Sequence, residues 1–365
     1  MMKSTGVYIH VPFCAKKCPY CDFYSRTGNE KAYEAYTDIL LQKISGWGEK
    51  LDRKADTLYF GGGTPSLLGA ERLVRIAERV RNCFGNDITE TTVEVNPSRE
   101  DFDFGKLIKG GINRISVGLQ SADDEELKFL GRQHDSAQAK KCINAAKNAG
   151  FENISLDLMI ALPDQTKSSL ERSVEFCAEQ GAKHISAYIL KIEPQTVFYK
   201  NREKLNLPDD DESAELYETL CDLMKQYGYN HYEISNFCKS GYESRHNLKY
   251  WHDEEYIGIG PSAHSFIDGK RFYCPRKMKS FEEDEYIPDG EGGGEEEFIM
   301  LGLRLSEGIT NERYLQKFGK TIPEKYLRNA QRFEKAGLVR ISDSGFALTE
   351  KGFMVSNSLI TEILT

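Results

Sequence analysis

The chain has 365 residues, of which 39% are hydrophobic, so it is long enough for one large α/β domain and a smaller one. Its net charge of −9 argues against a general nucleic-acid-binding surface. No run of residues approaches the ~20 apolar positions that a membrane-spanning helix needs, and the first residues lack the apolar core of a signal peptide.

The nine cysteines are odd in number and widely scattered beyond residue 21, so they do not form the pattern of a disulfide framework. We therefore expect a protein of the reducing cytoplasm. Two acidic runs, at 209–212 and 295–297, are expected to be solvated loops or helix starts.

Short apolar strands alternate with amphipathic helices through residue 190. The predicted strands are 7–11, 57–60, 92–95, 114–118, 154–159 and 184–190. The predicted helices between them include 31–45, 70–83, 137–149 and 168–180. Such alternation predicts an α/β fold with a parallel sheet and helices outside it. Six units fit a partial (β/α)6 TIM-like barrel, although a doubly wound sheet stays open.

The pattern changes beyond residue 195, and we predict three domains, at 1–200, 201–290 and 291–365. The middle one starts with a helix at 213–227, continues to an aromatic and histidine-rich stretch at 245–266, and ends at a Gly/Glu-rich linker, 289–297. The last domain has helices near 296–305, 311–318 and 323–336 and then a hairpin at 338–349, an order typical of a small winged-helix-like domain. It lacks a dense basic stripe, so we expect packing or dimerisation and no nucleic-acid partner.

Cys14, Cys18 and Cys21 form a C-x3-C-x2-C run directly after the first predicted strand. Iron–sulfur clusters are held by cysteine thiolates, and three thiolates on a [4Fe–4S] cluster leave the fourth iron open. S-adenosylmethionine can chelate such an iron through its amino and carboxylate groups. The alternative is a structural zinc site of the three cysteines and His10, although no second cysteine knuckle is present.

Polar residues also follow the other predicted strands, where the active sites of parallel α/β folds lie. The run 61–64, Gly-Gly-Gly-Thr, lacks dinucleotide-site and P-loop spacing, so it is either a tight turn or a backbone that approaches a ligand closely. Glu94 and Asp157 are suited to ribose hydroxyls or an ammonium group, and Arg132 to a carboxylate. Taken alone, residues of these kinds are more often structural.

Six motifs carry a family resemblance: YIHVPFCAKKCPYCDF, YFGGGTPS, EVNP, RISVGLQS, LGRQH and LDLMIALP. In this order, over nearly all of residues 6–200, they resemble the radical SAM branch that contains oxygen-independent coproporphyrinogen III oxidase and the haem chaperone HemW. The resemblance implies a six-unit partial barrel and a [4Fe–4S] cluster on Cys14, Cys18 and Cys21. It implies S-adenosylmethionine contacts from Tyr8, Tyr20, Gly62, Gly63, Thr64, Glu94, Gln120, Arg132 and Asp157. Five of these would line the place where the oxidase holds a second S-adenosylmethionine, namely Gly63, Thr64, Gln120, Arg132 and Asp157.

Two features favour the haem chaperones over the oxidase. Only 13 residues precede Cys14, whereas the oxidase has a longer N-terminal segment that helps to bind its porphyrinogen. The run RHNLKYW at 245–251 resembles the H-N-x-x-Y-W signature of the HemW branch, and CPYCDF at 18–23 also resembles that branch. We therefore expect a haem chaperone, with an oxidative decarboxylase as the alternative. Its expected partners are a haem-accepting protein and an electron donor, with a transient membrane contact and a homodimer as further possibilities.

The 245–251 segment contains the predicted haem-binding residues. His246 is a candidate ligand of haem iron, because neutral imidazole binds iron well. Tyr250, four residues on, would share its helical face, and the rings of Tyr250 and Trp251 could cover a porphyrin, with Asn247 beside them. Arg245 could pair with a propionate. His252 and His264 are alternative iron ligands, and a purely structural packing of His246 and Trp251 stays open.

Overall fold

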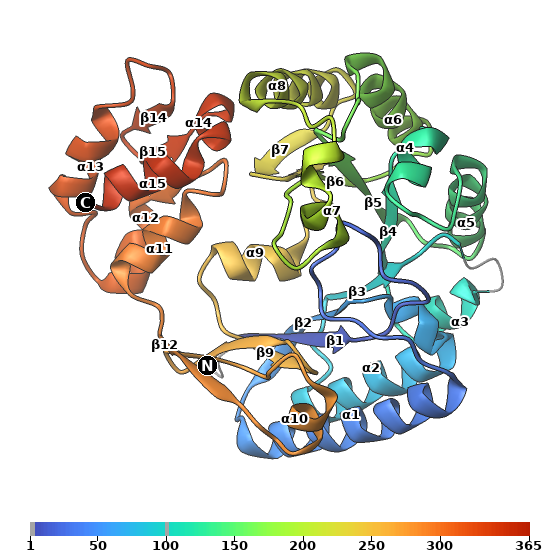
Figure 1. Ribbon diagram of the computed structural model, residues 1–365. Helices are drawn as coiled ribbons and strands as arrows, with labels where there is room; N and C mark the ends of the chain where they lie inside the picture. Colours follow the sequence, from blue (N-terminus) through green and yellow to red (C-terminus); the bar gives the residue numbers. More distant parts are fainter. Residues whose placement is uncertain (1–3, 99–101) are drawn as a thin grey trace.

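Six parallel strands form the centre of the molecule (Figure 1). The computed structural model describes residues 4–98 and 102–365. The strands lie side by side in chain order and are β1 (Ser4–Val11), β2 (Lys54–Gly62), β3 (Glu90–Val95), β4 (Arg114–Gln120), β5 (Asn153–Ile160) and β6 (His184–Ile189). The six predicted strands are thus confirmed, each within three residues of its predicted ends.

Helices cover the outer face of these strands. They are α1 (Glu30–Lys50), the 3-10 helix η1 (Pro65–Leu68), α2 (Ala70–Phe84), α3 (Phe104–Lys109), α4 (Asp124–Phe129), α5 (Ser136–Asn148) and α6 (Lys167–Glu179). Val7, Ile9 and Val11 alternate along β1 and share one apolar core with Leu40 and Ile44 of α1. Each such fully buried aliphatic side chain contributes about 1.5–3 kcal/mol, so this outer layer holds the barrel together.

The sheet continues beyond the barrel on both sides, through elements that the periodicity did not reveal. After α7 (Val197–Lys200), η2 (Arg202–Lys204) and α8 (Asp210–Gln226) come the strands β7 (Asn230–Glu233) and β8 (Asn236–Cys238). β8 pairs antiparallel with β6, and β7 pairs antiparallel with β8 at the edge of the sheet. After α9 (Arg245–Trp251), the chain adds β9 (Tyr256–Ile259), β10 (His264–Ile267), β11 (Lys270–Tyr273) and, past α10 (Met278–Glu282), β12 (Ile287–Glu291). β9 runs parallel to β1, and β10 to β12 are antiparallel.

The twelve strands have the order β12-β11-β10-β9-β1-β2-β3-β4-β5-β6-β8-β7, so β12 and β7 are the two edges. This agrees with the predicted partial barrel. The predicted linker at 289–297 is wrong, because its first residues belong to β12, which pairs with β11, and its last ones to a helix that begins at Glu295. The acidic run 209–212 is a helix start, as expected, since Asp209 and Glu212 form a capping box at the beginning of α8.

The last part of the chain is a small helical unit with its own three-stranded sheet, drawn in orange and red in Figure 1. Its elements are α11 (Glu295–Gly302), β13 (Ile309–Thr310), α12 (Asn311–Phe318), α13 (Glu324–Gln331), β14 (Val339–Ser342), β15 (Gly345–Leu348), α14 (Glu350–Met354) and α15 (Ser356–Leu364). The predicted hairpin is formed by β14 and β15, and β13 pairs with the free side of β15. Across the described ranges, no helix is both long and apolar enough to cross a membrane.

Candidate functional site

A cavity of about 450 Å³ lies at the carboxyl ends of the six parallel strands. Each strand or the loop after it contributes to its wall, because parallel strands all end at the same side of the sheet. The cavity brings together eleven of the predicted site residues, namely Cys14, Cys18, Tyr20, Cys21, Gly62, Gly63, Thr64, Glu94, Gln120, Arg132 and Asp157. Tyr8 and the four predicted haem-binding residues are not part of its lining.

The three cysteines stand on a loop after β1, residues 12–26, which we call the cysteine loop. Backbone hydrogen bonds close its base, because Arg26 donates to Pro12 (2.8 Å) and Cys14 donates to Arg26 (3.0 Å). Further contacts hold its sides: Phe198 donates its backbone N–H to the Pro19 carbonyl at 3.0 Å, and Arg276 pairs with Asp22 at 2.9 Å. The fold thus presents residues 14–21 to the cavity on a loop that is fixed at several points.

The donor set of the cysteine loop fits an iron–sulfur cluster. Cys14, Cys18 and Cys21 are free thiols that line the same cavity. The Thr64 hydroxyl lies 3.6 Å from the Cys14 sulfur and a guanidinium nitrogen of Arg132 lies 3.8 Å from the Cys18 sulfur. Two of the three sulfurs thus have a polar donor beside them, and cysteine sulfur is the atom that holds iron–sulfur clusters.

The alternative zinc site finds no support. In residues 4–98 and 102–365, no three His, Cys, Asp or Glu side chains are grouped as ligands of a single metal ion. His10 is buried, and its ring nitrogens lie 3.2 Å from the Tyr8 hydroxyl and 3.1 Å from the Tyr24 carbonyl. A zinc ion needs its ligands to converge on one atom, whereas the thiolates of a cluster bind different irons.

The glycine run at the end of β2 is required by close packing against β1. A Cβ atom at Gly63 would lie 2.6 Å from the Phe13 carbonyl oxygen, and one at Gly62, where φ is +108°, would lie 2.6–2.8 Å from the His10 ring. The backbone is fixed here, since Gly63 and Thr64 donate to the Val11 and Phe13 carbonyls at 2.8 and 2.7 Å. The run is therefore a tightly packed turn, and Gly62 and Gly63 also expose their backbone to the cavity, where a ligand could approach it closely.

Two carboxyl groups lie in the floor of the cavity. Burial, and secondarily the neighbouring Asp157, raises the pKa of Glu94 to about 7, although the Tyr59 hydroxyl donates to Glu94 at 3.0 Å. Burial also raises the pKa of Asp157, which accepts a hydrogen bond from Ser116 at 2.9 Å. Such carboxylates favour a ligand that donates hydrogen bonds or carries positive charge.

Arg132 and Gln120 also line the cavity. Arg132 donates to the Gly118 carbonyl at 2.8 Å, while its Nε is buried with no hydrogen-bond partner among the described residues. A buried donor without a partner is costly, so this guanidinium is suited to an anionic ligand group. Gln120 has φ +72°, a strained backbone for a residue other than glycine, at an irregularity of the β4–β5 pairing.

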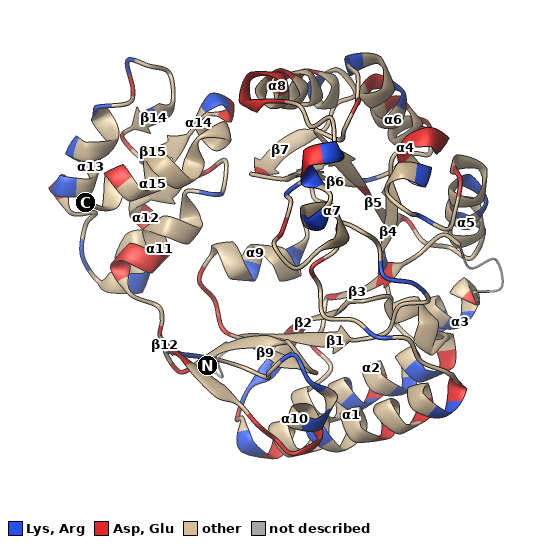
Figure 2. Cartoon of the chain, in the orientation of Figure 1, with Lys and Arg blue, Asp and Glu red and all other residues tan. Residues whose placement is uncertain are grey.

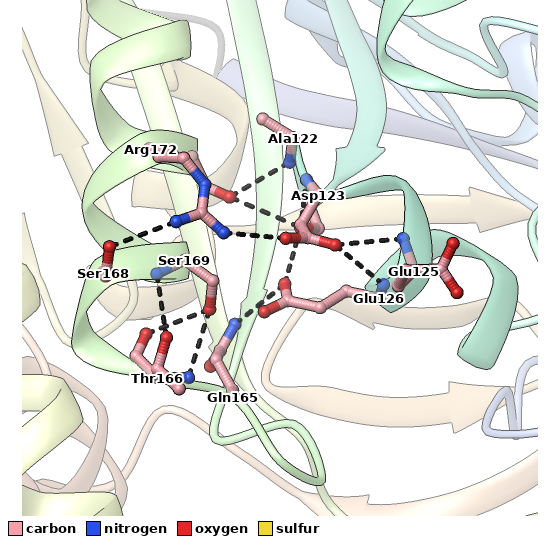
Figure 3. Close-up of polar contacts among 11 residues, drawn as sticks. Ala122, Asp123, Glu125, Glu126, Gln165, Thr166, Ser168, Ser169 and Arg172 are labelled. Atoms are coloured by element: carbon pink, nitrogen blue, oxygen red, sulfur yellow. Dashed lines mark hydrogen bonds and ion pairs between the residues drawn. The ribbon is translucent and has the colours of Figure 1, made fainter.

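A polar network ties α4 to α6 (Figure 3). Asp123 caps α4 through the N–H groups of Glu125 and Glu126 and pairs with Arg172 of α6 at 2.8 Å. Gln165 donates to the Glu126 carboxylate at 3.2 Å. The network fixes the beginning of α4, and the segment that contains Arg132 follows the other end of this helix.

The predicted haem segment forms α9, at the amino ends of the strands and therefore opposite the cysteines. His246 is fully buried, and its ring nitrogens lie 2.9 Å from the Thr57 hydroxyl and 2.8 Å from the Tyr250 hydroxyl. The shared helical face of His246 and Tyr250 is thus confirmed. Burial lowers the pKa of His246 to about 3. Glu90, the first residue of β3, accepts the backbone N–H groups of Arg245 and His246, both at 3.0 Å.

We call the hydrogen-bonded pair of His246 and Tyr250, with the helix α9 that holds it at the amino ends of the strands, the α9 plug. The other residues of α9 lie around this pair. Asn247, Tyr250 and Trp251 are half-buried, Arg245 is exposed, and the Arg304 guanidinium lies 5.7 Å from the Trp251 ring. Tyr8 stands between the two ends of the barrel, with its ring 6.2 Å from Tyr59 and 6.4 Å from His246. As the structure stands, His246 has no free nitrogen to offer to iron.

Several cavity residues were not predicted. Tyr59, Ser116, Met159 and Tyr188 all line the cavity. Each stands on a strand at a position that alternates with buried core residues, so a period of two counted from Asp157 or Gly118 could have found Met159 and Ser116. The exposed Phe23 on the cysteine loop had no such signal.

Comparison with known proteins places the chain among radical SAM proteins. Residues 8–177 match the Radical SAM superfamily, and residues 296–355 match the HemN C-terminal domain. The heme chaperone HemW of Bacillus subtilis is 35% identical, over 100% of this chain and 99% of that protein. The proteins named heme chaperone HemW in Lactococcus lactis and Escherichia coli are 33% and 34% identical over nearly their full lengths.

Among solved structures, the coproporphyrinogen III oxidase HemN of Escherichia coli superimposes with a TM-score of 0.82. The superposition covers 100% of this chain and 91% of that one, at 22% sequence identity. At this identity the likeness concerns the fold alone, and it agrees with the partial barrel and the small C-terminal unit described above.

Proposed function

Because this chain belongs to the family of the heme chaperone HemW, within the radical SAM superfamily, we propose that it binds haem and delivers it to an acceptor protein. The observation that carries the proposal is the full-length similarity to several proteins of that name. The cavity with its three thiols supports the same assignment, since radical SAM proteins hold their cluster in such a place.

Within this proposal, Cys14, Cys18 and Cys21 hold a [4Fe–4S] cluster. Bound there, the cluster would supply an electron to S-adenosylmethionine. The buried and unpartnered Nε of Arg132 would meet a carboxylate group of that ligand, and Glu94 and Asp157 would accept hydrogen bonds from its ammonium or ribose groups. Gly62, Gly63, Thr64, Tyr20 and Gln120 would complete the wall around it, with the Tyr8 ring stacked 6.2 Å from that of Tyr59.

Haem binding by His246 would require α9 to leave the barrel, because both ring nitrogens are bonded and the side chain is fully buried. Asn247, Tyr250 and Trp251 would then lie beside it as the rest of the site. In this hypothesis, haem binds to the α9 segment only after that helix has moved.

The proposed partners follow from the transfer of haem. They are a haem-accepting protein, an electron donor for the cluster, and, during delivery, a second copy of the chain or a membrane surface. We propose the cytoplasm as the place of action, which nine free cysteines would suit.

The test is an anaerobic incubation of the reconstituted protein with S-adenosylmethionine, a reductant and coproporphyrinogen III, followed by mass analysis of the tetrapyrrole. An unchanged tetrapyrrole from protein with an intact cluster is expected of a haem chaperone. Loss of two carboxyl groups would instead make the protein an oxidative decarboxylase.

A further inference from the structure

A haem carrier needs a side chain that can reach iron, and the seven histidines of this chain are unequal in that respect. His10, His184 and His246 are buried, with both ring nitrogens within hydrogen-bond distance of a partner. His134 is buried and bonded to the Leu119 carbonyl, and both nitrogens of His231 are shielded from solvent. His252 stands between Glu254 and Glu307, at 3.5 and 3.3 Å.

His264 differs from the other six. Its side chain is 57% exposed at the beginning of β10, and its Nδ1 lies 3.8 Å from a carboxylate oxygen of Asp289. In the described part of the chain no hydrogen bond reaches its Nε2. Nδ1 therefore faces the Asp289 carboxylate, and Nε2 is the ring nitrogen that is open to a ligand.

The surroundings of His264 suit a flat apolar ligand. His264 pairs with Tyr273 of β11, which pairs with Ile287 of β12, so the three side chains form one row on one face of the sheet. The rings of His264 and Tyr273 are stacked at 5.0 Å, and Ile287 is exposed. Two strand spacings give this row a width of roughly 10 Å, enough to support a tetrapyrrole ring.

Positive charge lies next to this row, in a chain whose net charge is negative. Arg276, Lys277 and Lys279 are exposed between β11 and the first turn of α10, a stretch that is blue in Figure 2. Such cations suit the two propionates of haem. Arg276 also pairs with Asp22, the residue after Cys21, so the row lies beside the cysteine loop.

We propose that haem binds on this face of β10–β12, with His264 as the axial ligand of its iron and the basic stretch at its propionates. The inference rests on the proposed haem-carrying function and gives it a site that is open as the protein is folded, at the cluster end of the barrel. Burial lowers the pKa of His264 despite the neighbouring Asp289, so the imidazole is neutral at physiological pH and able to bind iron.

The experiment is a haemin titration of the purified, cluster-loaded protein, followed by absorption and electron paramagnetic resonance spectra. The wild type should show histidine-ligated ferric haem. His264→Gly should weaken binding at least tenfold and lose that signature, and added imidazole should restore it. His264→Tyr should replace it by the spectrum of a phenolate ligand. Lys270→Gly, an exposed position of β11 on the face opposite to Tyr273, serves as the matched control and should bind like the wild type.

The outcomes separate the two claims. A wild type that binds no haem would refute the proposed function itself. A wild type that binds haem, together with a His264→Gly variant of unchanged affinity and spectrum, would refute only this site and return the ligand to α9.

Discussion

Replacing Glu94 with glutamine should make the ligand-free protein more stable and its S-adenosylmethionine binding weaker. The carboxyl group lies half-buried in the cavity floor, and burial raises its pKa from 4.5 to about 7. A folded-state pKa above the unfolded one means that the folded state binds the proton more tightly. Stability of the wild type is therefore lost as the pH rises from 4.5 through 7, where the buried carboxylate must ionise.

The size of the effect follows from the same shift. A rise from 4.5 to about 7 corresponds to about 3 kcal/mol at most, and solvent in the cavity reduces it to about 1–2 kcal/mol. Glu94→Gln should gain that amount above pH 7 and nothing below pH 4.5. It should also lose about tenfold in affinity for S-adenosylmethionine, because a charge-assisted hydrogen bond is removed.

Urea denaturation of the ligand-free protein between pH 4.5 and 8 measures the first effect, and calorimetric titration of the cluster-loaded protein with S-adenosylmethionine measures the second. Glu49→Gln, an exposed position on α1, is the matched control and should change neither. A Glu94→Gln protein that is less stable than the wild type at pH 8, or that binds S-adenosylmethionine equally well, would refute the assignment of Glu94 as a destabilised ligand group.

Three other substitutions test the cluster, the glycine run and the α9 plug. Cys14→Ser should abolish the absorbance of the cluster after anaerobic reconstitution, and the control Cys83→Ser on α2 should retain it. A Cys14→Ser protein with its full content of iron and sulfide would overturn the proposed ligand set. Gly63→Ala should lower the free energy of unfolding, measured by urea denaturation, by about 1–3 kcal/mol, because its Cβ would lie 2.6 Å from a carbonyl oxygen. The control Gly46→Ala, whose Cβ would meet open space, should not destabilise the protein. Equal stabilities of the two variants would contradict the close packing at Gly63. His246→Ala should lower the free energy of unfolding by about 2–4 kcal/mol, because it leaves a cavity and removes the hydrogen-bond partner of the Thr57 and Tyr250 hydroxyls. An unchanged urea midpoint would show that the packing of His246 does not contribute to stability.

The barrel could be predicted because its signals are local. Apolar runs such as Val7 to Val11 are buried on one face and recur between amphipathic helices, which is how a parallel sheet under helices is encoded. The carboxyl ends of those strands then meet at one side, so the cysteines, Glu94, Gln120 and Asp157 converge from the strand order alone.

The rest depended on contacts between distant segments. The five residues of β12 are all exposed, so the strand has no alternation of buried and exposed side chains. Its Gly and Glu residues are typical of a loop, yet its backbone pairs with β11. The position of α9 is set by Glu90 and Thr57, more than 150 residues earlier, so its sequence could not tell that His246 is buried. The exposure of His264 likewise depends on the antiparallel extension of the sheet, which periodicity did not reveal.

The most direct test of the account is the stoichiometry of haem binding by the purified, cluster-loaded protein, measured by anaerobic titration and gel filtration. A haem chaperone should retain haem in an equimolar complex that survives the column. Protein with an intact cluster that retains no haem would contradict the account.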